Sequence, residues 1–255
     1  MRGLMQTYNK ILILCMGLLT AGSLIAQTIG NPIGTQGYKH WTLSASSNYS
    51  NIEIENQKMV VNKHLAKATF GAAPMFDLYL LGGASKLKVK FKPNPYDDQY
   101  RFTYGFGFQW ELLSETKEQP VEIWLNAQAI RFQSKDTYAI SGTASSSSKW
   151  FNAMEYDWRE LNGAIGISLA LKRMKIYAGG IGWMLQRLDE KREYWNEKWW
   201  GPDKETFQSG FWYGATGGVE FHFPQNYKVC IEAIALNRTN YQIMVGINQT
   251  KIYNW

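Results

Sequence analysis

Three histidines are the side chains with which acid–base or nucleophilic catalysis would most readily begin in this sequence of 255 residues. His40 begins the first predicted strand and His222 lies beside Pro224, so both are expected near one end of the molecule. His64 lies in the middle of a predicted strand, with no serine or aspartate within a few residues along the chain. None of the three stands in a cluster of acid, base and nucleophile. The sequence therefore predicts polar turn or interface residues here, and no enzyme.

Metal, cofactor and nucleic-acid chemistry is not indicated either. The chain has two cysteines, and because Cys15 lies in an apolar N-terminal run, Cys230 alone would remain in a mature chain. This excludes an intramolecular disulfide and a cysteine metal cage. No glycine-rich phosphate loop, metal-spacing motif or serine nucleophile elbow occurs, and we expect no cofactor. The net charge of +6 comes from interspersed basic and acidic residues, which does not indicate a nucleic-acid surface.

The N-terminal segment has the pattern of an export signal. Basic side chains at Arg2 and Lys10 precede a long apolar run that ends in a small residue. Residues 1–26 are therefore predicted to be a signal peptide. Leu24 is large for its place before the cut, so cleavage after Ala21 is an alternative, and a membrane anchor is another.

Beyond the leader, the chain must be built from strands. In residues 101–112 every even position is aromatic or leucine, and every odd position is polar or glycine. Residues 121–129, 207–223 and 241–248 alternate in the same way, and helical spacing is hard to find. No later stretch approaches the roughly 18 apolar residues of a membrane-spanning helix. Long strands with one aromatic face fit a transmembrane barrel better than a soluble sandwich.

The predicted fold is an all-β, transmembrane up-and-down antiparallel β-barrel of about ten strands, formed by residues 27–255, with 27–37 as a flexible N-terminal segment. The strands are predicted at 38–50, 58–72, 75–91, 99–113, 120–134, 155–171, 173–188, 206–223, 227–237 and 240–253. Short turns alternate with longer connections, and the two longest predicted loops are 135–154 and 189–205. Eight strands is the second choice, because residues 51–65 alternate poorly.

Several local patterns resemble a known group of proteins. They are the turn Ala72-Ala73-Pro74 before Phe76-Asp77-Leu78-Tyr79, the strand Tyr104-Gly105-Phe106-Gly107-Phe108 and the terminal Tyr253-Asn254-Trp255. Together with the leader, they resemble the small outer-membrane β-barrels of Gram-negative bacteria, the porin-like or OmpA/OmpW-like group.

The resemblance implies a monomer in the cell outer membrane with both termini in the periplasm, in contact with outer-membrane lipid and lipopolysaccharide. It also implies that Tyr253 and Trp255 form the signal that the outer-membrane assembly machinery reads. Gly246 stands farther from the end of the chain than the corresponding glycine of the group. The fold itself does not select a function, because barrels host pores, adhesins and enzymes alike.

Strand parity predicts which polar side chains face the barrel interior. They are Arg101, Gln109, Glu111, Glu122, Asn126, Gln128, Glu160, Glu220, Lys228 and Glu232. A barrel this narrow is largely filled by side chains, so we expect a polar network that plugs it. Because glutamates outnumber the basic residues in this set, the alternative is a narrow passage that favours cations over anions.

The two long connections differ in composition. Residues 141–150 are small and polar, which is typical of a solvated loop. Residues 187–205 combine nearly balanced charges with aromatics, including Trp195, Lys198, Trp199 and Trp200. Such a set of side chains either recognises a ligand or packs against the base of the loop that carries it. The predicted function is a non-enzymatic structural barrel or narrow porin-like passage. A surface adhesin or receptor using residues 187–205 is the alternative, and an outer-membrane enzyme with an unlocated site is the third.

Overall fold

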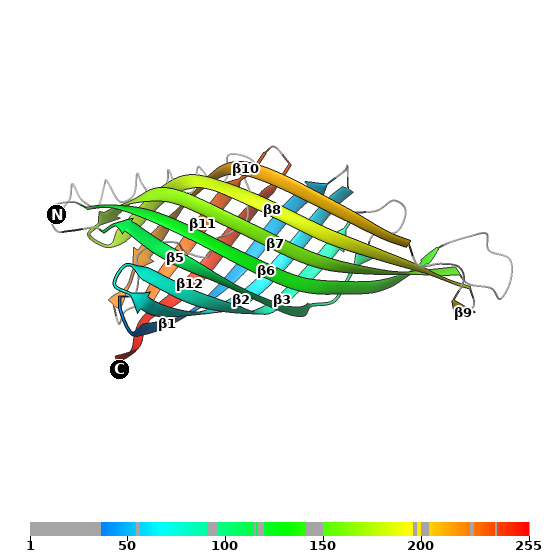
Figure 1. Cartoon of the computed structure of the whole chain (residues 1–255), viewed down its shortest axis with the longest axis horizontal. Coiled ribbons are helices and arrows are strands. Elements are labelled where there is room, and N and C mark those ends of the chain that lie inside the picture. The colour runs from blue at the N-terminus through cyan, green and yellow to red at the C-terminus, as the bar shows by residue number, and fades with distance from the viewer. Residues whose placement is uncertain are drawn as a thin grey trace, which may run out of the picture.

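The structure, a computed structural model, describes residues 37–54, 57–90, 96–114, 116, 120–140, 150–195, 198–199, 204–224, 227–237 and 239–254. Ten long strands run antiparallel to their neighbours (Figure 1). They are β1 (His40–Ile54), β2 (Gln57–Ala73), β3 (Phe76–Val89), β5 (Arg101–Leu113), β6 (Val121–Ile140), β7 (Trp150–Leu171), β8 (Met174–Trp195), β10 (Lys204–His222), β11 (Tyr227–Ala235) and β12 (Tyr241–Asn254). Two short strands, β4 (Tyr96–Asp97) and β9 (Lys198–Trp199), pair with β3 and β8.

The sheet closes on itself because the first strand pairs with the last. Ser47 of β1 lies opposite Val245 of β12 on one side and opposite His64 of β2 on the other. The ten-strand barrel predicted from the sequence is confirmed, and the eight-strand alternative is wrong. We call the end where β1 begins and β12 ends the near end, and the opposite end the far end.

The residues that alternate poorly, 51–65, are nevertheless paired strand. Met59 and Val61 of β2 point inward and are fully buried, while Lys58 and His64 point outward and are exposed. At this height the interior is apolar and the outer wall carries polar groups. The usual contrast between the two faces of a membrane strand is therefore lost in the sequence, although the pairing continues.

The outer wall over the rest of the barrel is apolar and exposed. On β5, Phe102 and Phe106 are 72% and 64% exposed, whereas Thr103 and Gln109 point inward and are buried. This arrangement is the reverse of a soluble core and is typical of a barrel that faces lipid. Across the described ranges, no helix combines the length and apolar character that a membrane crossing requires.

Three strands, β6, β7 and β8, are much longer than predicted. The expected loops 135–154 and 189–205 are wrong over most of their length, because β6 continues to Ile140, β7 begins at Trp150 and β8 continues to Trp195. Of the predicted solvated loop 141–150, residues 141–149 lie outside the described residues, and Trp150 already belongs to β7. Beyond the membrane neither face of a strand must be apolar, so the period-2 pattern that marks the other strands fades there.

Four strands, β6, β7, β8 and β10, project beyond their neighbours at the far end (Figure 1). Pairing between β5 and β6 stops at Thr103 and Phe132, and pairing between β10 and β11 stops at Ala215 and Ala235. Past these points β6, β7, β8 and β10 pair only with one another and with β9. We call residues 133–140, 150–157, 188–195 and 204–214 the projecting sheet.

Candidate functional site

The far half of the interior is filled by apolar side chains. Phe132 stacks on Trp158 with ring centroids 5.5 Å apart, and Trp183 stacks on Trp212 at 4.9 Å. One continuous buried cluster joins these rings to the far ends of β1, β2, β3 and β11, and it extends towards the near end as far as Trp124 and Tyr177. Its members include Ile52, Ile54, Met59, Val61, Leu87, Val89, Tyr156, Leu185, Ile234 and Leu236. The mouth of the barrel is therefore closed by packed side chains.

Beside this cluster, a buried ion pair crosses the interior. Lys63 of β2 donates to both carboxylate oxygens of Glu160 on β7, at 2.6 and 2.7 Å. The Trp158 indole also donates to Glu160, so the carboxylate has a third donor. Both charged side chains are almost completely inaccessible, at 1% and 0% exposure. Buried charges are tolerated when they are paired and hydrogen-bonded in this way.

Arg187 makes a second contact across the barrel. Its strand, β8, is five strands away from β2 in both directions around the sheet. The guanidinium nevertheless donates to Gln57 of β2 at 2.9 Å and lies 5.1 Å from the Tyr156 ring centroid. Arg187 is fully buried. Opposite walls of the barrel are thus joined through single side chains.

The near half of the interior holds three further polar groups. Glu122 accepts from Lys175 at 2.6 Å and from Ser168 at 3.1 Å. Glu232 accepts from Tyr177 at 3.1 Å and from Thr216 at 3.0 Å.

Glu220 is the third. It lies 3.1 Å from Lys228 Nζ and 2.7 Å from His222 Nε2. The three acids have basic or hydroxyl partners, so these three carboxylates give the interior little bias towards cations.

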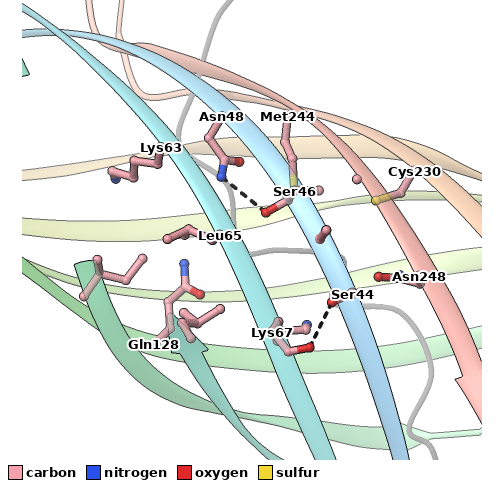
Figure 2. Close-up of a pocket in the computed structure, with 14 residues that line it drawn as sticks. Ser44, Ser46, Asn48, Lys63, Leu65, Lys67, Gln128, Cys230, Met244 and Asn248 are labelled. Atoms are coloured by element: carbon pink, nitrogen blue, oxygen red, sulfur yellow. Dashed lines mark hydrogen bonds between the residues drawn. The ribbon is translucent and has the colours of Figure 1, made fainter. Parts of the chain in front are cut away.

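A small cavity lies between the two halves, on the side of β1, β2 and β12. Figure 2 shows Ser44, Ser46 and Asn48 of β1 lining it beside Lys63 and Lys67 of the adjacent strand β2. Cys230 and Met244 line its other side. The cavity volume is about 20 Å³. That is room for about one water molecule, and far too little for a solute path.

Most of the residues expected in the interior from parity are found there. Buried side chains that point inward are Gln109, Glu111, Glu122, Asn126, Gln128, Glu160, Glu220 and Glu232. Lys228 is partly buried beside Glu220. Arg101 is the exception: its side chain is 43% exposed at the far rim, where it pairs with Asp98 at 3.1 Å. Arg101 is the first residue of β5, where the wall already ends.

Sequence reasoning missed the basic members of the network. Lys63, Lys67 and Lys175 are buried and point inward, and so does Arg187. On β2 the signal was available, because Lys63 and Lys67 share the parity of Leu65 and Thr69. The poor alternation of the surrounding segment hid it.

The proposed recognition residues lie at the tip of the projecting sheet. Trp195 ends β8 and pairs with Lys198 of β9, and Tyr194 pairs with Trp199. Trp200 lies outside the described residues. In the terminal strand, Tyr253 pairs with Trp41 of β1, whereas Trp255 lies outside the described residues.

On the outer wall, His64 has partners that its neighbours in the sequence did not indicate. Its Nδ1 lies 3.0 Å from Ser47 Oγ on β1, and its Nε2 lies 3.0 Å from the Tyr100 hydroxyl. A serine–histidine pair is the start of a nucleophilic site. Here, however, the orienting partner is a phenol where a catalytic triad has a carboxylate, so the arrangement is an oriented polar cluster. Across the described residues, no group of three or more potential metal ligands forms.

Charged side chains collect on the outer wall near the far rim. Arg131 and Arg159 both donate to Asp157, with Nε to carboxylate oxygen distances of 2.9 and 3.0 Å. Farther round the barrel, hydrogen bonds from Lys86 and Lys88 lower the pKa of Asp97 on β4.

Comparisons with known proteins give a fold and no family. No protein-family model and no curated protein matches this chain. Among solved structures, the chain is similar to the translocator domain of the autotransporter NalP from Neisseria meningitidis, with a TM-score of 0.51 and 9% identity over 85% of this chain and 89% of that one.

Two other solved structures are more distant. The outer membrane protein OprG from Pseudomonas aeruginosa has a TM-score of 0.37 at 10% identity, over 84% of this chain and 98% of that one. The outer membrane protease OmpT from Escherichia coli has a TM-score of 0.38 at 10% identity, over 82% and 92%. The NalP likeness shows the closed antiparallel barrel fold of an outer-membrane β-barrel, and the fold leaves the activity open.

Proposed function

We propose that this protein is a non-enzymatic outer-membrane barrel with a sealed interior, which holds the projecting sheet above the cell surface. The near end would lie in the periplasm and the far end outside. The exposed apolar wall and the likeness in fold to a translocator domain support the membrane location. The expected assembly signal at Tyr253 and Trp255, the signal peptide and the monomeric state belong to the same proposal.

One observation carries the sealed interior: side chains from opposite walls meet inside the barrel. Arg187 reaches Gln57, and Lys63 reaches Glu160. A porin-like passage needs a continuous wet path, whereas the far half of this interior is an apolar cluster. Transfer of an ion through that cluster would cost far more than transfer through a polar pore, because the ion would lose its hydration without gaining partners.

Planar-bilayer conductance tests this proposal. The refolded wild-type protein should insert without a steady unitary current. A variant with Phe132→Ala, Trp158→Ala and Arg187→Ala removes three of the large side chains that fill the far half. This variant should conduct, and its current would also prove insertion. A stable wild-type current of the same kind would overturn the sealed interior.

A second candidate function is surface recognition by the projecting sheet. The observation that favours it is the length of β7 and β8, which stay paired out to Trp150 and Trp195. Recognition residues on a rigid sheet lose less conformational entropy on binding than residues on a free loop. Trp195, Lys198, Trp199 and Trp200 would then contact a surface polymer or glycan by stacking.

A further inference from the structure

The outer wall is hollowed below the two arginines that share Asp157. This groove has a volume of about 350 Å³, within the range of small-molecule sites. Ala129 of β6 forms its floor, between Phe106 of β5 and Leu161 of β7. Phe106 and Leu161 are exposed, at 64% and 50%. A short side chain between two long ones is what makes the wall concave here.

The upper end of the groove is cationic. Arg131 and Arg159 lie opposite each other on β6 and β7, and their side chains are 41% and 53% exposed. Asp157 accepts from two nitrogens of each guanidinium. A guanidinium has five N–H donors, so each arginine keeps donor capacity. Two positive charges against one negative charge leave an excess of one positive charge at this point.

A second hollow, of about 530 Å³, continues the groove towards the far rim. It shares Tyr104 and Arg131 with the first, and it adds Lys135, which is 56% exposed and pairs with Glu155 at 3.3 Å. From the middle of the wall to the rim, the order is therefore apolar groove, arginine pair and wider polar hollow.

We propose that this groove, which we call the Arg131–Arg159 groove, binds one phosphate-bearing lipid of the outer leaflet. The proposal rests on the membrane location proposed above. An acyl chain lies along Ala129, Phe106 and Leu161, and the phosphate lies against the two guanidinium groups. The order of apolar groove and cationic rim matches the order of chain and headgroup in a lipid. Planar guanidinium forks bind phosphate oxygens bidentately, and the extra negative charge offsets the local positive excess.

Native mass spectrometry of the refolded barrel in neutral detergent tests the phosphate contact. The probes are diphosphorylated lipid A, the same glycolipid without phosphates, and inorganic phosphate. We expect one bound diphosphorylated lipid per barrel and at least tenfold weaker binding of the dephosphorylated one, since the loss of one good charge-assisted contact corresponds to about that factor. Equal binding of the two glycolipids would overturn the proposal. Inorganic phosphate that binds as tightly as the diphosphorylated lipid A would also overturn it.

Matched variants test the position of the site. Arg131→Gln with Arg159→Gln should weaken lipid binding about tenfold or more, whereas Arg173→Gln at the opposite end should not. Ala129→Trp fills the groove and should also abolish binding, with both arginines in place. Unchanged binding by both groove variants would refute the assignment. A barrel that conducts yet selects the phosphorylated lipid would overturn the sealed interior alone, and a folded, non-conducting barrel without lipid preference would overturn the groove alone.

Discussion

Lys63 and Glu160, from strands on different sides of the barrel, meet in its interior with 2.6 Å between Nζ and Oε1. The pair adjoins the apolar cluster directly, because Trp158 belongs to that cluster and donates to Glu160. The charged network of the near half and the packed core of the far half are therefore one connected interior. Its behaviour under mutation follows from that connection.

Breaking this ion pair on one side should destabilise the barrel strongly. Lys63→Met or Glu160→Met alone leaves an uncompensated buried charge and should lower the free energy of unfolding by about 3–5 kcal/mol. The double variant, Lys63→Met with Glu160→Met, should recover most of that loss. Denaturant unfolding in lipid vesicles measures all three. Lys86→Met, which breaks an exposed pair with Asp97, is the control and should change stability little.

The two faces of β12 should respond differently to charge. Val245 is 49% exposed on the outer wall, whereas Asn248 points to the cavity in the polar interior. Val245→Arg should lose about 2–4 kcal/mol if the site lies near the bilayer midplane, and Asn248→Arg should lose less. The same vesicle unfolding assay applies. Equal losses at both positions would contradict the outward assignment of Val245.

Closure of the sheet should make the folded protein resistant to detergent. An unheated sample should migrate at a different position from a boiled sample in gel electrophoresis. The reason is that the closed wall of the barrel, below the projecting sheet, has no open edge at which unfolding can start. The band should come from the outer-membrane fraction of cells. Identical mobility, or recovery from the soluble periplasm, would count against a membrane barrel.

The tip of the projecting sheet can be separated from the barrel by mutation. Replacement of Trp195, Trp199 and Trp200 by alanine should abolish binding to a glycan array and leave heat-modifiability unchanged, because Trp195 and Trp199 lie beyond the wall that closes the barrel. Trp110→Ala, on the outer wall of β5, is the matched tryptophan control and should keep binding. A triple variant that binds normally but melts early would show that the tryptophans only brace the sheet.

Acid should loosen the contact between β4 and β3. Hydrogen bonds from Lys86 and Lys88 lower the pKa of Asp97, so the folded form favours the carboxylate. A lowered pKa contributes stability that is present above the ordinary carboxyl pKa and is lost as the pH falls through the lowered value. The protection of the Tyr96 and Asp97 amides against hydrogen exchange, measured relative to their intrinsic exchange rates, should therefore fall at low pH. In Asp97→Asn the exchange rate should already be raised at neutral pH.

The sequence was sufficient to predict the barrel, but it was not sufficient to predict which side chains are in contact. Alternation located all ten strands because each must present an apolar face to lipid, and it placed Glu122 and Glu232 inside by parity. It could not extend β7 or β8 beyond the membrane, where that requirement ends. Nor could it pair His64 with Ser47, 17 residues away, or Lys63 with Glu160, 97 residues away, because such partners depend on register and on curvature around the barrel.

The continuous pairing of β7 with β8 also has a mechanical consequence. The register runs without a shift from Trp150 opposite Trp195 to Leu171 opposite Met174. Antiparallel hydrogen bonds lie perpendicular to the strands, so a pull on the tip along the strand axis loads many of them in shear at once. Arg187 transmits part of that load to β2, on the opposite side of the barrel. If a cell were tethered through this tip, the load would be distributed over the whole barrel before any single hairpin separated from it.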